Sequence, residues 1–209
     1  MELLSPAGSY ESMVAAVQNG ADAVYMGGTM FNARRNAKNF DDSELERAID
    51  YCHIRSARAY VTMNTLLFDR EMASALRYAE FLYRIGADAL IVQDTGLISE
   101  LNVRIPDLEL HASTQMGIHT EGGLRACRRL GLRRAVISRE VSLEGLSRLS
   151  RAKTGVEIEA FAHGALCMSF SGGCLYSSMA GERSGNRGMC AQPCRKPASA
   201  AGYPQESDF

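Results

Sequence analysis

Four of the six cysteines in this 209-residue chain fall within 28 residues, in a stretch that carries almost no apolar periodicity. They are Cys167, Cys174, Cys190 and Cys194. Outside oxidising compartments, clustered thiols are more often metal ligands or catalytic groups than disulfides. The remaining two, Cys52 and Cys127, lie within helical patterns among apolar neighbours, so we expect them to pack in the core.

The spacing of the four clustered cysteines favours an iron–sulfur cluster over zinc. Structural zinc sites prefer pairs of cysteines separated by two to four residues, and only Cys190 and Cys194 have that spacing. Iron–sulfur proteins accept wider and less regular spacing, and the glycines of this stretch would let backbone amides approach the sulfurs. Zinc, or a loop of inert thiols, are the alternatives.

A second group of polar residues follows the apolar runs that are typical of strands. On the predicted fifth strand His111, Ser113 and Gln115 alternate, and on the seventh Glu159 and His163 share a face. Polar residues on one face of a buried strand are costly unless they are paired or functional. The predicted site is therefore a polar pocket that includes His111, Gln115, Arg139, Glu159 and His163.

The individual residues of this pocket have plainer alternatives. Histidine suits acid–base or metal chemistry, but His111 and His163 could equally be hydrogen-bonded groups without a catalytic role. Arg139 stands at a strand end, where arginine is suited to bind an anion. It could instead form a simple ion pair with Glu140.

Seven apolar runs alternate with helical patterns over residues 1–166, from "MELLSPAG" to "VEIEAFAHG". Such alternation predicts parallel strands joined by crossover helices. The first strand is not followed by the G-x-G-x-x-G of dinucleotide-binding folds, and units of about 30 residues match a barrel. We predict an α/β fold, a TIM-type (β/α)8 barrel truncated after the seventh strand.

Three regions follow from this pattern: a barrel of seven units over 1–166, a Cys-rich loop over 167–196 and an irregular tail over 197–209. Barrel chemistry lies at the carboxyl ends of the strands, so the loop is expected to cover the barrel mouth. The tail has no strand or helix pattern. Because a missing strand leaves two unpaired edges, either the chain is a fragment or an oligomer or partner chain closes the barrel.

The composition of the chain limits which partners it is expected to bind and where in the cell it is expected to act. The chain is 46% hydrophobic and 22% charged, with a net charge of −1, so no global field attracts nucleic acid or a membrane. No secretory pattern and no apolar run of about 18 residues is present. We therefore expect a cytoplasmic protein without membrane contact, and any RNA contact would need a local basic patch.

The segment "EAFAHGALCMSFSGGCLYSS", residues 159–178, resembles the signature of the collagenase-like peptidase family of unknown catalytic type, number thirty-two. "NRGMCAQPCR" at 186–195 is similar to the block that follows it in that family, and the resemblance covers residues 1 to about 196. It implies a barrel-like domain. Some members are proteases of collagen or other proteins. Others resemble oxygen-independent hydroxylation factors, which act on tRNA, ribosomal RNA or the ubiquinone ring.

In the hydroxylation factors cysteines of this region hold a 4Fe–4S cluster. By position, the resemblance implies Cys167, Cys174 and Cys190 as ligands. The fourth ligand usually lies in a later segment, and in some members Cys194 serves instead.

Three functions remain open, and the first is favoured. They are iron–sulfur-dependent hydroxylation of a tRNA or rRNA base, proteolysis of a protein substrate, and a non-enzymatic metal-bearing scaffold. A cysteine protease needs a thiolate beside a histidine, for which Cys167 and His163 are the candidates, and neither H-E-x-x-H nor G-x-S-x-G is present. For RNA, the predicted basic patch consists of Arg183, Arg187, Arg195 and Lys196, whose alternative is an ordinary solvated surface.

Overall fold

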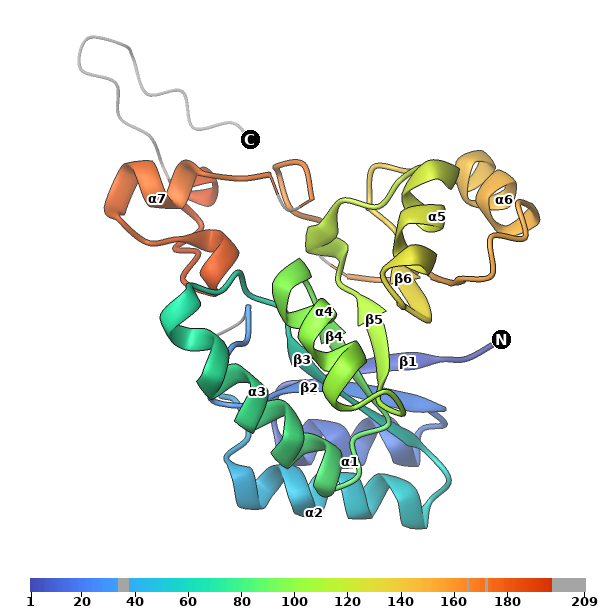
Figure 1. Cartoon of the computed structure of the whole chain (residues 1–209), viewed down its shortest axis with the longest axis vertical. Coiled ribbons are helices and arrows are strands. Elements are labelled where there is room, and N and C mark those ends of the chain that lie inside the picture. Colours follow the sequence, from blue (N-terminus) through green and yellow to red (C-terminus); the bar gives the residue numbers. More distant parts are fainter. Residues whose placement is uncertain (34–37, 165, 172, 197–209) are drawn as a thin grey trace, which may run out of the picture.

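The computed structural model describes residues 1–33, 38–164, 166–171 and 173–196 (Figure 1). Seven strands form one sheet in which each strand pairs in parallel with its neighbour in sequence. The strands are β1 (Leu4–Ala7), β2 (Ala23–Gly27), β3 (Arg58–Met63), β4 (Ala89–Val92), β5 (Glu109–Ala112), β6 (Arg134–Val136) and β7 (Glu157–Glu159). This sequential parallel order confirms the predicted barrel-type α/β fold, open between β1 and β7.

Helices connect successive strands and cover the outer face of the sheet. They are α1 (Tyr10–Gln18), α2 (Asp42–Ile54), α3 (Asp69–Arg84), α4 (Thr95–Arg104), α5 (Glu121–Arg129) and α6 (Leu143–Arg151). Most begin where a short polar side chain accepts a hydrogen bond from a backbone N–H of the first turn, as Asp41 does for α2 and Asp94 for α4. None of the helices in the described residues is long and apolar enough to cross a bilayer.

The main core lies between the strands and the outer helices. Leu90 of β4 packs there with Leu97 of α4 and Leu82 of α3, all fully buried. Cys52 and Cys127 are also buried in this core, on α2 and α5, which confirms the packing role predicted for them. Burial of this kind is the dominant stabilising term in a domain.

The inner face of the sheet carries a charged network near the amino ends of the strands. Arg134 of β6 contacts Glu2 at 2.5 Å and Glu157 at 2.9 Å, and the Tyr60 hydroxyl donates to Glu2 at 2.9 Å. Since Glu2 precedes β1, these contacts join the two ends of the open sheet across the interior. A buried guanidinium is tolerated only when it is paired in this way.

The seventh strand is shorter than the pattern 156–164 predicted. It ends at Glu159 because its neighbour β6 offers only three residues for pairing. The chain after Glu159 therefore leaves the sheet and leads into residues 166–196.

We call the described residues 166–171 and 173–196 the Cys-rich segment. It contains α7 (Tyr176–Gly181) and the 3-10 helices η2 (Gly185–Arg187) and η3 (Pro193–Arg195), and η1 (Thr114–Met116) follows β5. The tail predicted over 197–209 lies outside the described residues.

Candidate functional site

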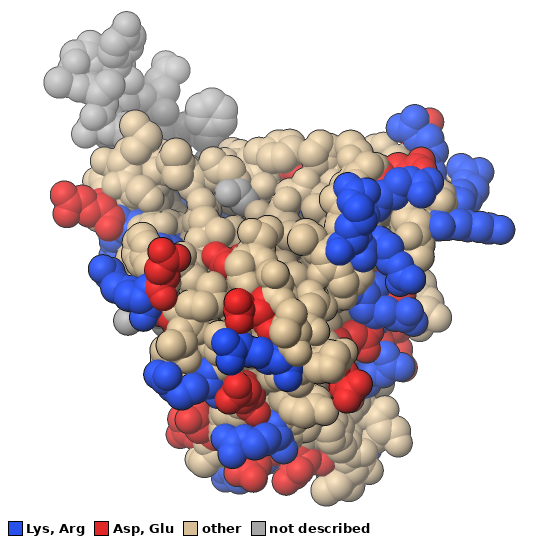
Figure 2. Space-filling model, viewed as in Figure 1, with Lys and Arg blue, Asp and Glu red and all other residues tan. Residues whose placement is uncertain are grey.

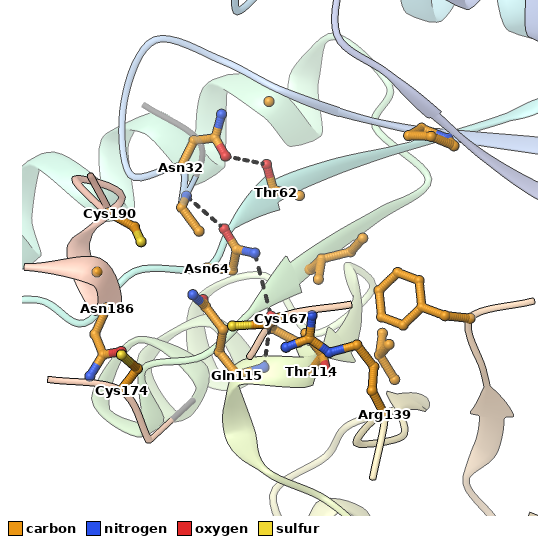
Figure 3. Close-up of a pocket in the computed structure, with 18 of the residues that line it drawn as sticks. Asn32, Thr62, Asn64, Thr114, Gln115, Arg139, Cys167, Cys174, Asn186 and Cys190 are labelled. Carbon is orange, nitrogen blue, oxygen red and sulfur yellow. Dashed lines mark hydrogen bonds between the residues drawn. The ribbon is translucent and has the colours of Figure 1, made fainter. Parts of the chain in front are cut away.

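A cavity of about 580 Å³ lies at the carboxyl ends of the strands, between the barrel and the Cys-rich segment (Figure 3). Parallel strands end at a common edge, so residues far apart in sequence meet there. Polar lining residues from the barrel are Asn32, Asn39, Thr62, Asn64, Ser113, Thr114, Gln115, Arg139 and Glu159. The Cys-rich segment contributes Asn186 and all four clustered cysteines.

Neutral amides lie on the barrel side of this cavity, and hydrogen bonds fix the orientation of Asn64 and Asn32 among them. Asn64 accepts from the backbone N–H of Ala33 at 3.0 Å and donates to Ser113 at 3.4 Å. Thr62 donates to Asn32 at 3.3 Å. Side chains held in one orientation present their polar atoms at fixed positions, which is the condition for specific recognition.

Gln115 presents an unused acceptor. Its Oε1 atom is buried and has no hydrogen-bond partner among the described residues, and the same holds for the hydroxyl of Thr114. A buried acceptor left unpaired costs about 1–3 kcal/mol. The side chain of Gln115 lines the cavity, so a ligand that donates a hydrogen bond there would recover this cost.

Glu159 supplies an acid at the cavity wall. Burial raises the pKa of its carboxyl to about 7, and the attraction of Arg134 opposes that rise only in part. The Oε2 atom lies 3.7 Å from Nη1 of Arg134. A carboxyl with a pKa near neutrality can take up or release a proton at physiological pH, which is the property of a general acid–base.

Arg139 and Glu140 both contact the Cys-rich segment through Ser171. Nε of Arg139 donates to the Ser171 hydroxyl at 3.3 Å, and Glu140 accepts from the backbone N–H of Ser171 at 2.8 Å. Burial alone would raise the pKa of Glu140, but backbone hydrogen bonds, including that from Ser171, lower it. Arg139 therefore lines the cavity and also helps to position the segment that covers it.

The two predicted histidines do not line this cavity. His111 is fully buried on the inner face of the sheet, edge-on to Tyr60 with 4.8 Å between ring centroids, and burial lowers its pKa to about 3. Its imidazole is therefore neutral. His163 lies beyond the end of β7 and is exposed. Of the five predicted pocket residues, the cavity brings together Gln115, Arg139 and Glu159.

The four thiols come to the cavity from separate parts of the Cys-rich segment. Cys167 follows the exit from β7, Cys174 precedes α7, and Cys190 and Cys194 flank the start of η3. Arg195 donates to the carbonyl of Leu166 at 2.6 Å, which ties the end of the segment to its beginning.

Gly185 lies between two of these thiol-bearing stretches. A Cβ at this glycine would stand 3.7 Å from Cβ of Cys190 and 3.9 Å from the carbonyl oxygen of Cys174. This arrangement brings residues 174 and 190 together around one turn of backbone.

The thiols around this cavity match an iron–sulfur cluster in type and number. A four-iron cluster takes one thiolate at each corner, and four thiols line this cavity. The backbone N–H of Gln192 donates to Sγ of Cys190 at 3.4 Å, and hydrogen bonds to sulfur tune such clusters.

One ion pair anchors the Cys-rich segment to the barrel. Arg187 binds Glu71 of α3 through both guanidinium nitrogens, at 2.6 and 3.0 Å, and donates to the carbonyl of Leu66 at 2.6 Å. Its guanidinium also lies 4.3 Å from the ring centroid of Phe68. The hydrogen bonds from Arg187 lower the pKa of Glu71 to about 2.

This anchor changes the interpretation of the basic residues beside the cysteines. From the sequence, Arg187 and Arg195 form with Arg183 and Lys196 either a basic patch for RNA or an ordinary solvated surface. The structure uses Arg187 and Arg195 to hold the segment in place. No sequence signal identified the anchor, because Glu71 already has a local explanation: its carboxylate accepts from the backbone N–H of Phe68 at 2.8 Å, at the start of α3.

The fold and the position of the cavity define a class of protein. A parallel sheet in sequential order, with a polar cavity at the carboxyl ends of its strands, is the arrangement of (β/α)-barrel enzymes. Within that class, the model of Peptidase family U32 matches residues 8–206, and the chain belongs to this family. This confirms the resemblance seen in the sequence.

Two curated relatives and one solved structure are similar to this chain. A 23S rRNA 5-hydroxycytidine synthase of Escherichia coli is 43% identical over 197 residues, covering 94% of this chain and 29% of that protein. The tRNA hydroxylation protein P of the same organism is 35% identical over 194 residues, covering 93% and 43%. The chain thus spans less than half the length of either relative.

The solved structure of a U32 peptidase superposes with a TM-score of 0.64 at 17% identity, covering 77% of this chain and 68% of the other. At that identity the likeness concerns the fold alone.

Proposed function

We propose that this protein is an iron–sulfur-dependent enzyme that hydroxylates a base in transfer or ribosomal RNA. Two relatives that match nearly the whole chain are named for hydroxylation of rRNA and tRNA. The proposal also rests on the gathering of four thiols and a set of fixed amides around one cavity. Protein side chains alone supply no redox chemistry for a ring carbon, so a cofactor must supply it.

The lining of the cavity is the observation that carries this proposal. A volume of about 580 Å³ lies within the range of small-molecule sites and accommodates a nucleobase turned out of its strand. Amide side chains can hydrogen-bond the edge of such a base, and aromatic rings can stack on its face. Both kinds of group are present, with Tyr25, Phe161, Phe170 and Tyr176 among the lining residues.

Each lining group has a defined task in this proposal. Oε1 of Gln115 accepts a hydrogen bond from an N–H group of the base, while Asn64 is held to read a neighbouring position. Glu159 is placed to exchange a proton with the bound base, because its pKa of about 7 allows both protonation states. Cys167, Cys174, Cys190 and Cys194 would hold the cluster, which supplies the redox step.

Proteolysis, the activity in the family's name, has less support from the geometry. A cysteine protease needs a histidine within hydrogen-bond reach of the thiol. His163 and Cys167 are both exposed, His163 does not line the cavity, and no hydrogen bond joins these two residues within the described structure. The pKa of about 7 at Glu159, on the cavity wall, favours an enzyme over a non-enzymatic scaffold.

The test compares RNA from a strain that lacks the gene with RNA from the parent strain. Mass spectrometry of nucleosides should show the loss of one hydroxylated pyrimidine, restored by the wild-type gene but not by Cys174→Ser or Glu159→Gln. A Cys127→Ala gene is the control, because this thiol lies in the core away from the cavity. RNA that is unchanged in the deletion strain would rule out the proposal.

A further inference from the structure

The charge of this chain is unevenly distributed. Residues 121–153 contain nine Lys and Arg against three Asp and Glu, a net charge of +6, so the other 176 residues carry −7. The near-neutral total hides this separation. Figure 2 shows the result as a gathering of basic side chains at the upper right, where Figure 1 places α5 and α6.

Six exposed cations make up what we call the α5–α6 surface. They are Arg125, Arg128, Arg129, Arg148, Arg151 and Lys153. Within the described structure only Arg125 has a carboxylate partner, Glu121 at 2.5 Å. Arg128 and Arg151 reach backbone carbonyls at 3.4 and 3.1 Å, which leaves their charge uncompensated. Unpaired cations concentrated on one face attract polyanions.

Helix-dipole stabilisation does not account for this surface. Basic residues near a helix C-terminus contribute about 0.3–1 kcal/mol each, and several of the six occupy such positions. The same effect acts on α3 and α4, yet each of these helices has only one basic residue in its last turn, Arg84 in α3 and Arg104 in α4. Arg104 is also paired with Glu100 at 3.0 Å. The excess on α5 and α6 therefore needs another explanation.

The position of this surface connects it to the cavity. The chain between β5 and α5 carries Gln115, and the chain between β6 and α6 carries Arg139, and both residues line the cavity. The helices that bear the unpaired cations start from these two wall segments, and they run down the outside of the barrel, so that their basic last turns lie toward the amino ends of the strands. A polymer whose base occupies the cavity could extend from there along this flank.

We propose that the α5–α6 surface binds the phosphate backbone of the RNA whose base enters the cavity. This inference rests on the proposed function and names where the RNA lies. Five of the six cations are arginines, whose guanidinium group matches phosphate geometry. Binding at this surface explains how a chain with a net charge of only −1 holds a polyanion.

The test reverses charge at two unpaired positions and compares a matched control. The variant is Arg129→Glu with Arg148→Glu, and the control is Arg77→Glu with Arg84→Glu on α3, which changes the net charge equally at two exposed sites away from α5 and α6. The probes are bulk tRNA and vesicles that contain anionic lipid. Binding is measured over a range of salt concentrations, with thermal unfolding recorded to confirm that both proteins fold.

We expect the α5–α6 variant to bind tRNA at least about tenfold more weakly, with its salt slope reduced by about 1.4, since each lost single-strand phosphate contact removes about 0.7. The control should bind like the wild type. Equal losses in both variants, no loss in either, or a loss confined to vesicle binding would overturn the inference. If the α5–α6 variant does not fold, Arg129→Gln with Arg148→Gln replaces it, with the same criteria.

Activity separates a failure of this inference from a failure of the proposed function. Wild-type protein that binds tRNA through the α5–α6 surface but hydroxylates no RNA would remove the proposed function and leave the binding surface intact. Hydroxylation with an unchanged KM for RNA in the α5–α6 variant would remove the surface and leave the function intact.

Discussion

The barrel and the Cys-rich segment are held together in different ways. Barrel residues such as Leu90 and Leu97 are fully buried between the sheet and its helices. In the Cys-rich segment large apolar side chains are exposed, with Met179 at 84% and Met168 at 75%. Its position depends instead on polar contacts, chiefly those of Arg187. The thiols therefore lie on a part of the molecule that the barrel positions, rather than on a part that folds by its own burial.

The largest effect should come from the barrel core. Replacing Leu90 with Ala removes buried methyl groups from the middle of the sheet, which costs about 2–5 kcal/mol of unfolding free energy. The matched change in the Cys-rich segment, Met179→Ala, should stay within about 0.5 kcal/mol because this side chain is exposed. Urea unfolding measures both. Equal losses would show that the segment has a buried core of its own.

The next largest effect should be confined to the ion pair between Arg187 and Glu71, which anchors the Cys-rich segment to the barrel. Glu71→Gln removes the charge that Arg187 binds but keeps an acceptor for the backbone N–H of Phe68 at the start of α3. Loss of a charge-assisted pair should weaken docking by about 1–3 kcal/mol. Limited proteolysis should then cut within residues 166–196 faster, while the barrel unfolds at an almost unchanged urea concentration. Glu80→Gln, an exposed change on the same helix, is the control. If both variants are cut alike, the anchor is not what holds the segment.

Acid should weaken the same contact by a smaller amount. The Arg187 hydrogen bonds, together with a smaller contribution from the backbone N–H of Phe68, lower the pKa of Glu71 from its ordinary 4.5 to about 2. The stabilisation is therefore complete above about pH 4.5 and is lost as the pH falls toward 2. Hydrogen exchange of residues 185–190, corrected for intrinsic rates, should show less protection at pH 3 than at pH 5. In Glu71→Gln, protection at pH 3 and at pH 5 should be the same. If protection still falls at pH 3 in this variant, another titrating group is responsible.

A second pH effect concerns Glu159 and has the opposite sign. Burial raises the pKa of this carboxyl from 4.5 to about 7, so the folded state holds a proton that the unfolded state has lost. Barrel stability should therefore fall by about 1 kcal/mol or more as the pH rises from 5 to 8. Glu159→Gln should remove this part of the pH dependence of urea unfolding. A profile with the wild-type slope would mean that Glu159 is ionised throughout.

Most of the barrel could be predicted from the sequence because its signals are local. The strands follow apolar runs, and polar caps such as Asp41 and Asp94 mark where helices start. The extent of β7 could not be predicted, because it depends on the three residues that β6 offers for pairing. His163 was expected on the face of a longer strand and is exposed for that reason.

The candidate site was predictable in its chemistry but not in its assembly. Spacing and composition singled out the four cysteines, and alternation along the chain singled out Gln115, which lines the cavity although β5 ends before it. The anchor between Arg187 and Glu71 joins residues 116 positions apart. Neither residue carries a pattern that points to the other, and the same is true of the contact between Arg139 and Ser171.

Iron and sulfide content after anaerobic reconstitution tests the central claim most directly, namely that the barrel brings four thiols to one cavity where they hold a cluster. The wild type should bind about four iron and four sulfide per chain, the content of one 4Fe–4S cluster. Cys174→Ser should lose most of both, and Cys52→Ser should retain them because Cys52 is in the core. Wild-type protein without iron and sulfide, or equal content in all three proteins, would contradict the account.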